Sequence, residues 1–140
     1  FIDSPGGEVR SGLALYDVIR FVSEIKPITT ICLGRAASMG AVLLCAADKR
    51  LALPHSQIMI HDASFSNADF SGMKPDEISE KSKDLLKTTT ILRKIITERT
   101  GQKAKTVEDR MRKDSYFESD EAVSFGLLTN VIESISEVIA

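Results

Sequence analysis

The positions of hydrophobic residues in the first half of the chain predict alternating strands and helices. Leu13, Tyr16 and Ile19 recur at the spacing of one helical face, and Pro27 ends that helix. Residues 28–33 form a short β-branched run, which is typical of a strand. The same reasoning assigns the other elements of this half, in chain order: a strand end at Phe1-Ile2, a turn at 4–7, small flexible residues over 34–40, a buried apolar helix over 41–47, and strands over 50–53 and 57–60.

One long helical pattern dominates the second half of the chain. Residues 62–75 are polar with scattered aromatic side chains, and they predict a loop or a loosely paired strand. Residues 76–100 then follow a helical pattern, and Gly101 is a typical stop just after a helix. Three shorter elements complete the chain: a helical turn or two over 106–112, a capped helix over 119–126 and a last strand over 129–132.

The order strand, helix, strand, helix, strand predicts an α/β fold with right-handed crossovers and a largely parallel sheet. At 1.5 Å per residue, the helix over 76–100 is roughly 38 Å long, more than a small core needs. It either projects and packs on a partner or lies across its own sheet. A partner is favoured by its apolar stripe, which consists of Ile78, Leu85, Leu92 and Ile95–Ile96.

Composition narrows the class of protein. The chain has 140 residues, 43% hydrophobic and 27% charged, which suits one globular domain over 1–140. It begins at Phe1 without an initiator methionine, so we expect that an N-terminal segment is missing. The net charge is −2 without a block of basic residues, which argues against a nucleic-acid partner. The longest nearly apolar run, 40–47, is far shorter than the ~20 residues that span a membrane.

The cysteines and histidines give little support to a metal site. Cys32 and Cys45 lie in apolar stretches and read as buried free thiols, which is typical of a reducing compartment. With 2 histidines and no C-x-x-C motif, the chain has few ligands for zinc. We therefore expect no metal.

Ser38 is the candidate nucleophile. It follows a predicted strand, precedes a predicted helix, and has small neighbours in Gly34-Arg35-Ala36-Ala37-Ser38-Met39-Gly40. Small neighbours allow a sharp turn and let a substrate approach the hydroxyl group, as in a nucleophile elbow. The alternative is that Ser38 merely caps the helix that follows.

His61 is the candidate general base. It lies directly after the strand over 57–60, where a sheet edge meets solvent, whereas His55 lies in an exposed Pro-His-Ser turn. A carboxylate should orient the imidazole of such a base. Spacing alone leaves four candidates open: Asp48, Asp62, Asp109 and Asp114.

Two backbone amides could stabilise a developing oxyanion. The Pro5-Gly6-Gly7 turn stands before a predicted helix and can offer one N–H group. The N–H group of Met39, directly after the candidate nucleophile, can offer the other. Alone, the glycine-rich turn is weak evidence, because it could be a plain connecting turn.

Together, these motifs make nearly the whole chain similar to the ClpP family, the proteolytic subunits of Clp protease. The shared motifs occur in family order: Ile2-Asp3-Ser4-Pro5-Gly6-Gly7, Ala36-Ala37-Ser38-Met39-Gly40-Ala41, Leu53-Pro54-His55-Ser56-Gln57-Ile58-Met59-Ile60-His61 and Glu98-Arg99-Thr100-Gly101-Gln102. The resemblance implies that Ser38 is the nucleophile, that His61 is its base and that Asp114 orients the imidazole. It also implies that the amides of Gly7 and Met39 form the oxyanion hole.

The resemblance further implies a crotonase-like fold of stacked ββα units with a projecting handle over about 62–100. Family members form two stacked seven-membered rings that enclose the active sites, and they receive unfolded polypeptides from a AAA+ unfoldase. No cofactor is implied, because any ATP is used by the unfoldase. The implied location is the cytoplasm or an organelle of bacterial origin.

Two segments depart from the family pattern. After the base the family reads Gln-Pro and then a glycine-rich strand, whereas this chain reads Asp62-Ala63-Ser64-Phe65 with only Gly72 later. Before the implied triad aspartate the family has an acidic residue and then Arg, whereas this chain has Arg112-Lys113. Since the first segment contacts the opposite ring in the family, we expect a weaker contact between rings.

The leading hypothesis from the sequence is a serine endopeptidase. A non-proteolytic ring subunit of a Clp-type complex is the first alternative, because the segment after His61 is altered. An acyl-CoA enzyme of the wider crotonase fold is the second. The pairing of Ser38 with His61 argues against that enzyme, whose chemistry needs no serine nucleophile.

Overall fold

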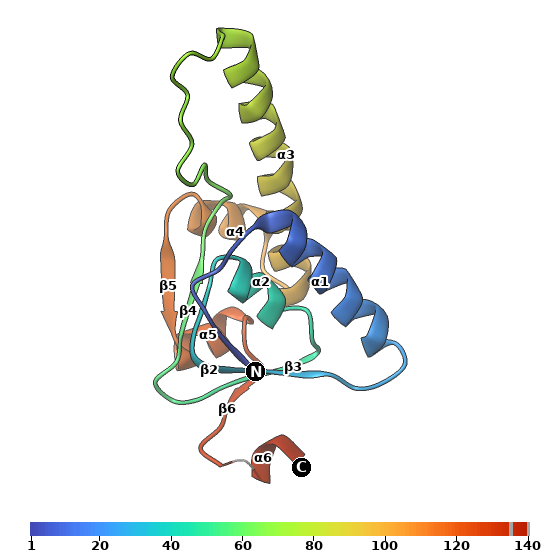
Figure 1. Ribbon diagram of the computed structural model, residues 1–140. Helices are drawn as coiled ribbons and strands as arrows, with labels where there is room; N and C mark the ends of the chain where they lie inside the picture. The colour runs from blue at the N-terminus through green and yellow to red at the C-terminus, as the bar shows by residue number, and fades with distance from the viewer. Residues whose placement is uncertain (135, 140) are drawn as a thin grey trace.

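The computed structural model describes residues 1–134 and 136–139 as a mixed α/β fold (Figure 1). Its elements, in chain order, are β1 (Ile2–Ser4), α1 (Val9–Ser23), β2 (Thr29–Ala37), α2 (Met39–Leu44), β3 (Lys49–Ala52), β4 (Gln57–Ile60), α3 (Pro75–Thr100), α4 (Ala104–Met111), β5 (Ser115–Glu118), α5 (Ser119–Phe125), β6 (Asn130–Val131) and α6 (Ser136–Ile139).

The sheet is largely parallel, as the sequence predicts. Its strands run in the order β5-β4-β2-β3-β6, and β1 pairs with β2 off this path. The first half of β2 pairs with β3, and its last residues pair with β4. Because β1 and β4 supply partners for its end, β2 continues to Ala37, through residues that the sequence suggested would be flexible. Ser38 therefore directly follows the last residue of a paired strand.

The sequence pattern missed β5, the only antiparallel strand among the described residues. Its four residues alternate between buried and exposed, with Phe117 inside and Tyr116 outside. Such a short run gives little local signal. Pairing with β4 decides its conformation, and this pairing is important for the site described below.

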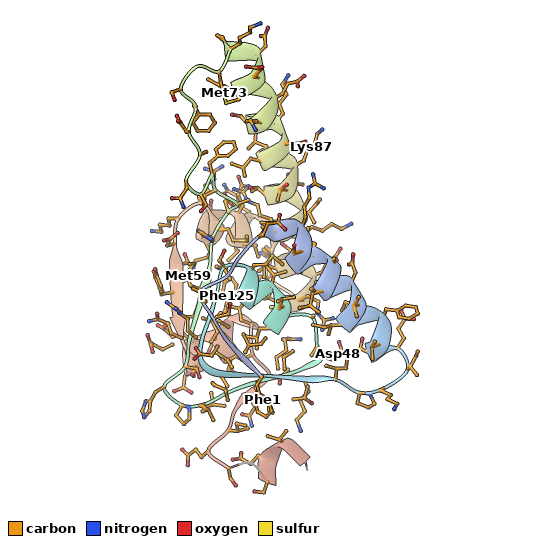
Figure 2. All side chains as sticks on the ribbon, in the orientation of Figure 1. Phe1, Asp48, Met59, Met73, Lys87 and Phe125 are labelled. Atoms are coloured by element: carbon orange, nitrogen blue, oxygen red, sulfur yellow. The ribbon has the colours of Figure 1, made fainter. Side chains whose placement is uncertain are left out.

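The long helix α3 both projects and packs on its own domain. In Figure 1 its N-terminal half stands away from the sheet beside the loop that follows β4, and its C-terminal half lies against the body. Figure 2 labels Met73 and Lys87 on the projecting part, far from Phe125 in the body. The predicted span of 76–100 agrees with the observed Pro75–Thr100.

The apolar stripe of α3 is divided: the residues of its C-terminal half pack on their own domain, whereas Ile78 and Leu85 are only half-buried, so packing on a partner remains a prediction for the projecting half. Leu92 and Ile96 are buried in the main core, and Leu85 is half-buried. The large apolar side chains that α3 leaves exposed are instead Leu86 and Ile91. The C-terminal half of α3 thus serves the core of its own chain.

The core lies around α2, which packs between the sheet, α1 and α3. Gly12 allows α1 to approach α2 closely, because a Cβ atom there would lie 2.2 Å from the side chain of Met39. With a larger residue here, either the Met39 side chain or the helices would have to move. This contact keeps the start of α1, and the Gly6-Gly7 turn before it, next to the end of β2.

Candidate active site

Ser38 lies at a sharp turn between β2 and α2. Its φ of 55° and ψ of −121° lie in a sparsely populated region for a residue with a side chain. Hydrogen bonds on both sides hold this conformation: the Ser38 N–H donates to the Met59 carbonyl, and the Ser38 carbonyl accepts from Ala41 and Val42. The geometry is that of a nucleophile elbow, which presents a hydroxyl group above a sheet.

Gly6 is required where the N-terminal turn passes the serine. A Cβ atom at Gly6 would lie 2.7 Å from the Ser38 Cβ and 3.1 Å from its hydroxyl oxygen. Its φ of 108° also favours glycine. The backbone of the turn can therefore reach the candidate nucleophile only without a side chain.

The pairing of β4 with β5 brings His61 and Asp114 together. The two strands are antiparallel, with Ile60 opposite Ser115. Continuing this register by one residue pairs His61 with Asp114, just beyond the end of the ladder. The hydroxyl group of Ser115 donates to the Arg110 carbonyl at 2.7 Å, which holds the turn that carries Asp114.

The three side chains form a continuous hydrogen-bonded series. His61 Nε2 lies 2.7 Å from Ser38 Oγ, and His61 Nδ1 lies 3.0 Å from Asp114 Oδ1. An imidazole with its proton on Nδ1 donates to the carboxylate and accepts from the hydroxyl group. The imidazole side chain is 23% exposed, so it lies mostly out of water.

The other acidic candidates interact elsewhere. Asp48 pairs with Arg20 and Arg99, Asp62 pairs with Arg93, and Asp109 pairs with Lys105. His55 is exposed in the turn before β4. Of the four carboxylates that spacing left open, only Asp114 is hydrogen-bonded to His61.

Gly7 and Met39 line the same cleft as Ser38. Met39 is the first residue of α2, so its N–H group has no acceptor within the helix. Gly7 directly follows the glycine that touches Ser38. Glu8, at the N-terminus of α1, accepts hydrogen bonds from the N–H groups of Ser11 and then Arg10, which lower its pKa and hold the turn in place.

The cleft has a volume of about 910 Å³ and runs between the N-terminal turn, the segment after His61 and α3. Apolar side chains contribute much of its wall, and these include Val42, Leu85 and Leu92. The serine, the imidazole and the two amides therefore lie at a cleft that can hold a chain of several residues.

The segment after His61 is a loop, one of the two conformations that the sequence left open. Phe65 and Phe70 pack edge to face within it, with ring centroids 5.1 Å apart. Arg112, where the chain departs from the ClpP pattern, pairs with Glu108 of its own α4.

The cysteines and the other possible metal ligands add no second reactive group or metal site among the described residues. Cys32 and Cys45 are free and buried, and burial raises the pKa of Cys45 to about 11. The described residues contain no group of three or more His, Cys, Asp or Glu side chains that could hold a metal ion. Among those residues, no helix is both long and apolar enough to cross a membrane.

A strained serine at the end of a parallel strand, hydrogen-bonded to an imidazole beside an open cleft, is typical of a serine hydrolase site. The family model described as Clp protease matches residues 1–135. The chain therefore belongs to the Clp protease family and has the ClpP-type fold of that family of peptidases. Membership also implies oligomeric assembly.

Sequence reasoning did not single out Arg93, which binds the residue next to His61. The sequence gives no clear signal for this role, because Lys94 stands beside Arg93 between Leu92 and Ile95 and its side chain is exposed.

Proposed function

We propose that this protein is a serine endopeptidase that hydrolyses unfolded polypeptides inside an oligomeric chamber. The observation that supports this function most directly is the hydrogen-bonded series of Ser38, His61 and Asp114 at the wall of an open cleft. Ser38 and His61 are already within hydrogen-bond reach, so proton transfer between them needs no rearrangement.

The reaction begins with attack of the serine on the peptide bond. Ser38 Oγ attacks the carbonyl carbon of the scissile peptide, and His61 Nε2 takes the hydroxyl proton. The imidazolium that forms is stabilised by Asp114 through Nδ1–H. The N–H groups of Gly7 and Met39 donate to the oxyanion, where negative charge develops.

The steps that follow release both products. His61 gives its proton to the leaving amine, the C–N bond breaks, and an acyl-enzyme ester remains on Ser38. Water then attacks the ester carbonyl, with His61 again as the base. The carboxylic acid product leaves and the hydroxyl group of Ser38 is restored, so no metal or organic cofactor is consumed.

An extended chain with apolar side chains suits the cleft best, because its wall combines backbone groups with Val42, Leu85 and Leu92. Burial of these residues against substrate side chains would orient the peptide bond at Ser38. A folded protein cannot present several residues in this way, which favours unfolded substrates. A separate AAA+ unfoldase would supply them and would use the ATP.

Exposed apolar residues favour assembly into rings. Helix α1 and the turn that follows it leave several large apolar side chains in solvent: Leu15, Val18, Phe21, Val22 and Ile25. A patch of this kind is typical of a protein–protein interface. We infer two stacked seven-membered rings of identical subunits, with the projecting half of α3 between the rings.

A serine-reactive fluorophosphonate probe tests the proposed function. The assembled wild-type protein should be labelled at Ser38 and should hydrolyse unfolded casein or a fluorogenic peptide. Ser38→Ala should abolish both activities without changing the assembly. His61→Ala should lose labelling, whereas the exposed turn variant His55→Ala should retain it.

Near-wild-type hydrolysis by Ser38→Ala would exclude this serine as the nucleophile. A folded, assembled wild-type protein that resists the probe would instead favour a non-proteolytic ring subunit. Saturable binding of acyl-CoA without peptide hydrolysis would favour the acyl-CoA alternative.

A further inference from the structure

The residue that follows the candidate base is held by an arginine of the long helix. Asp62 comes directly after His61, and its two carboxylate oxygens accept hydrogen bonds from Nε and Nη2 of Arg93. The Asp62 N–H also donates to the Met111 carbonyl at the end of α4, at 2.7 Å. The chain is therefore attached to α3 and α4 immediately after the imidazole.

The same guanidinium also contacts the element that leads to Asp114. Arg93 Nη1 lies 3.5 Å from Glu108 Oε1 of α4, and Glu108 in turn pairs with Arg112 at the end of that helix. Only Lys113 separates Arg112 from Asp114. Arg93 thus contacts the residue after His61 directly, and it reaches the segment before Asp114 through Glu108 and Arg112.

The position of His61 makes such a support necessary. Gln57–Ile60 lie in a strand, but the loop that begins at residue 61 has no ladder partner. Without Arg93, Asp62 would keep only the hydrogen bond from its N–H group to the Met111 carbonyl, among the described residues. Small shifts there would change the 2.7 Å separation of His61 from Ser38.

We propose that Arg93 is a positioning residue, which sets the place of His61 and Asp114 through a forked hydrogen bond to Asp62 and an ion pair to Glu108. This inference rests on the proposed function, because it assigns Arg93 a part in that reaction. Arg93 itself does not touch Ser38 or the imidazole.

The contact between Arg93 and Asp62 is suited to holding the backbone after His61 in one position. Side chains of Arg93 and Asp62 are 26% and 24% exposed, so water competes only partly for their hydrogen bonds. The bond to Asp62 also raises the pKa of Arg93, as expected for a stable charged pair. A planar guanidinium holds a carboxylate in one orientation, which the single ammonium group of lysine cannot do.

The test compares Arg93→Met, Arg93→Lys and the control Lys94→Met in the assembled protein. Lys94 is the next residue of α3, and its exposed side chain pairs only weakly with Glu98, at 3.8 Å. For each variant, kcat and KM are measured with a fluorogenic peptide. The rate of labelling by a small fluorophosphonate is also measured, because this probe reports the reactivity of Ser38 without filling the cleft. Light scattering and thermal unfolding monitor assembly and folding.

We expect Arg93→Met to lower kcat and the labelling rate together, on the order of 10-fold to 100-fold, with KM within about twofold. Arg93→Lys should recover less than half of the loss in log kcat and in the logarithm of the labelling rate. Lysine keeps the positive charge but cannot form the forked hydrogen bond to Asp62. Lys94→Met should stay within about twofold of wild type in both rates. Assembly should be unchanged in all three variants.

A second variant, Asp62→Asn, removes the charge of residue 62 and keeps the shape of its side chain. This variant is informative if Arg93→Met does not fold. If Arg93 acts through Asp62, the double variant Arg93→Met with Asp62→Asn should be no slower than the slower single variant. Unchanged labelling rates in both single variants, a loss only in KM, or a loss explained by disassembly would overturn the positioning role. Labelling that survives Ser38→Ala would instead contradict the proposed function itself.

Discussion

At the scale of single residues, the site depends on backbone strain at Ser38. A residue with a side chain in such a conformation costs about 1–3 kcal/mol. Three backbone hydrogen bonds, one donated and two accepted by Ser38, hold it there. Gly6 lies against the Ser38 side chain and has no side chain of its own, so the Ser38 hydroxyl group fits beside it. The strain therefore directs Ser38 Oγ toward the cleft.

The first prediction concerns Asp114. If its carboxylate accepts from His61 Nδ1–H, Asp114→Asn should favour the wrong imidazole tautomer and lower kcat by about 10⁴-fold, as in a comparable triad. Steady-state kinetics with a fluorogenic peptide measure the loss.

The matched control is Asp109→Asn, which removes a carboxylate that pairs with Lys105 on the surface of α4. Its kcat should stay within about threefold of wild type, because surface ion pairs contribute little. Equal losses in the two variants would mean that Asp114 has no special part in catalysis.

At the scale of elements, α3 has a buried face and an exposed face with different tasks. Leu92 and Ile96 of its C-terminal half are buried in the core of the chain, whereas Leu86 and Ile91 are exposed. Charged substitutions in the two groups should therefore act differently, although all four residues lie within three helical turns.

The second prediction separates folding from assembly. Leu86→Asp combined with Ile91→Asp should lower the assembly state by light scattering while leaving the far-UV circular dichroism of the subunit unchanged. Leu92→Asp should instead unfold the subunit, because it buries a charge in the core. If the exposed pair can be replaced without any change in mass, α3 does not contribute to the contact between subunits.

At the scale of the whole molecule, the loop over 62–74 bears on how rings would pair. The family has a strand at this place, whereas the described residues here form no ladder. The third prediction is that rising salt or dilution converts the assembly to single rings before it gives monomers. Analytical ultracentrifugation distinguishes these species, and direct dissociation to monomers would show that the contact between rings is not the weaker one.

Charge pairing also connects distant parts of the molecule. Asp48, after α2, accepts hydrogen bonds from Arg99 of α3 and Arg20 of α1. These bonds, first from Arg99 and then from Arg20, lower the pKa of Asp48. A carboxyl group with a lowered pKa in the folded state stabilises the fold above its unfolded pKa of about 3.9, and loses this contribution as pH falls through the folded value.

The fourth prediction follows from that sign. Asp48→Asn should lower the midpoint of thermal unfolding at pH 7, and the difference from wild type should shrink below about pH 4. The effect should be small, because the Asp48 side chain is 74% exposed. Asp17→Asn is the control, since Asp17 is exposed and has no salt bridge among the described residues. A difference that persists unchanged at pH 3 would contradict the assignment.

Local patterns in the sequence determined most of the elements. Apolar spacing predicted a helix over 76–100, and the observed Pro75–Thr100 differs by one residue. The strand at Gln57–Ile60 was also predicted with its observed bounds. Such features depend on neighbours within a few positions along the chain, where side-chain periodicity is informative. The motifs around Ser38 and His61 were likewise visible in the sequence as candidates for the site.

Contacts between distant residues decided the rest. Spacing left four aspartates open beside His61, and the resemblance pointed to Asp114. Only the antiparallel register of β4 and β5 explains why Asp114 lies at the imidazole. Likewise, no local pattern showed that Arg93 reaches Asp62, or that Leu92 faces the core of its own chain. These features depend on long-range pairing and packing, whose energies are set by which segments meet in space rather than by spacing along the chain.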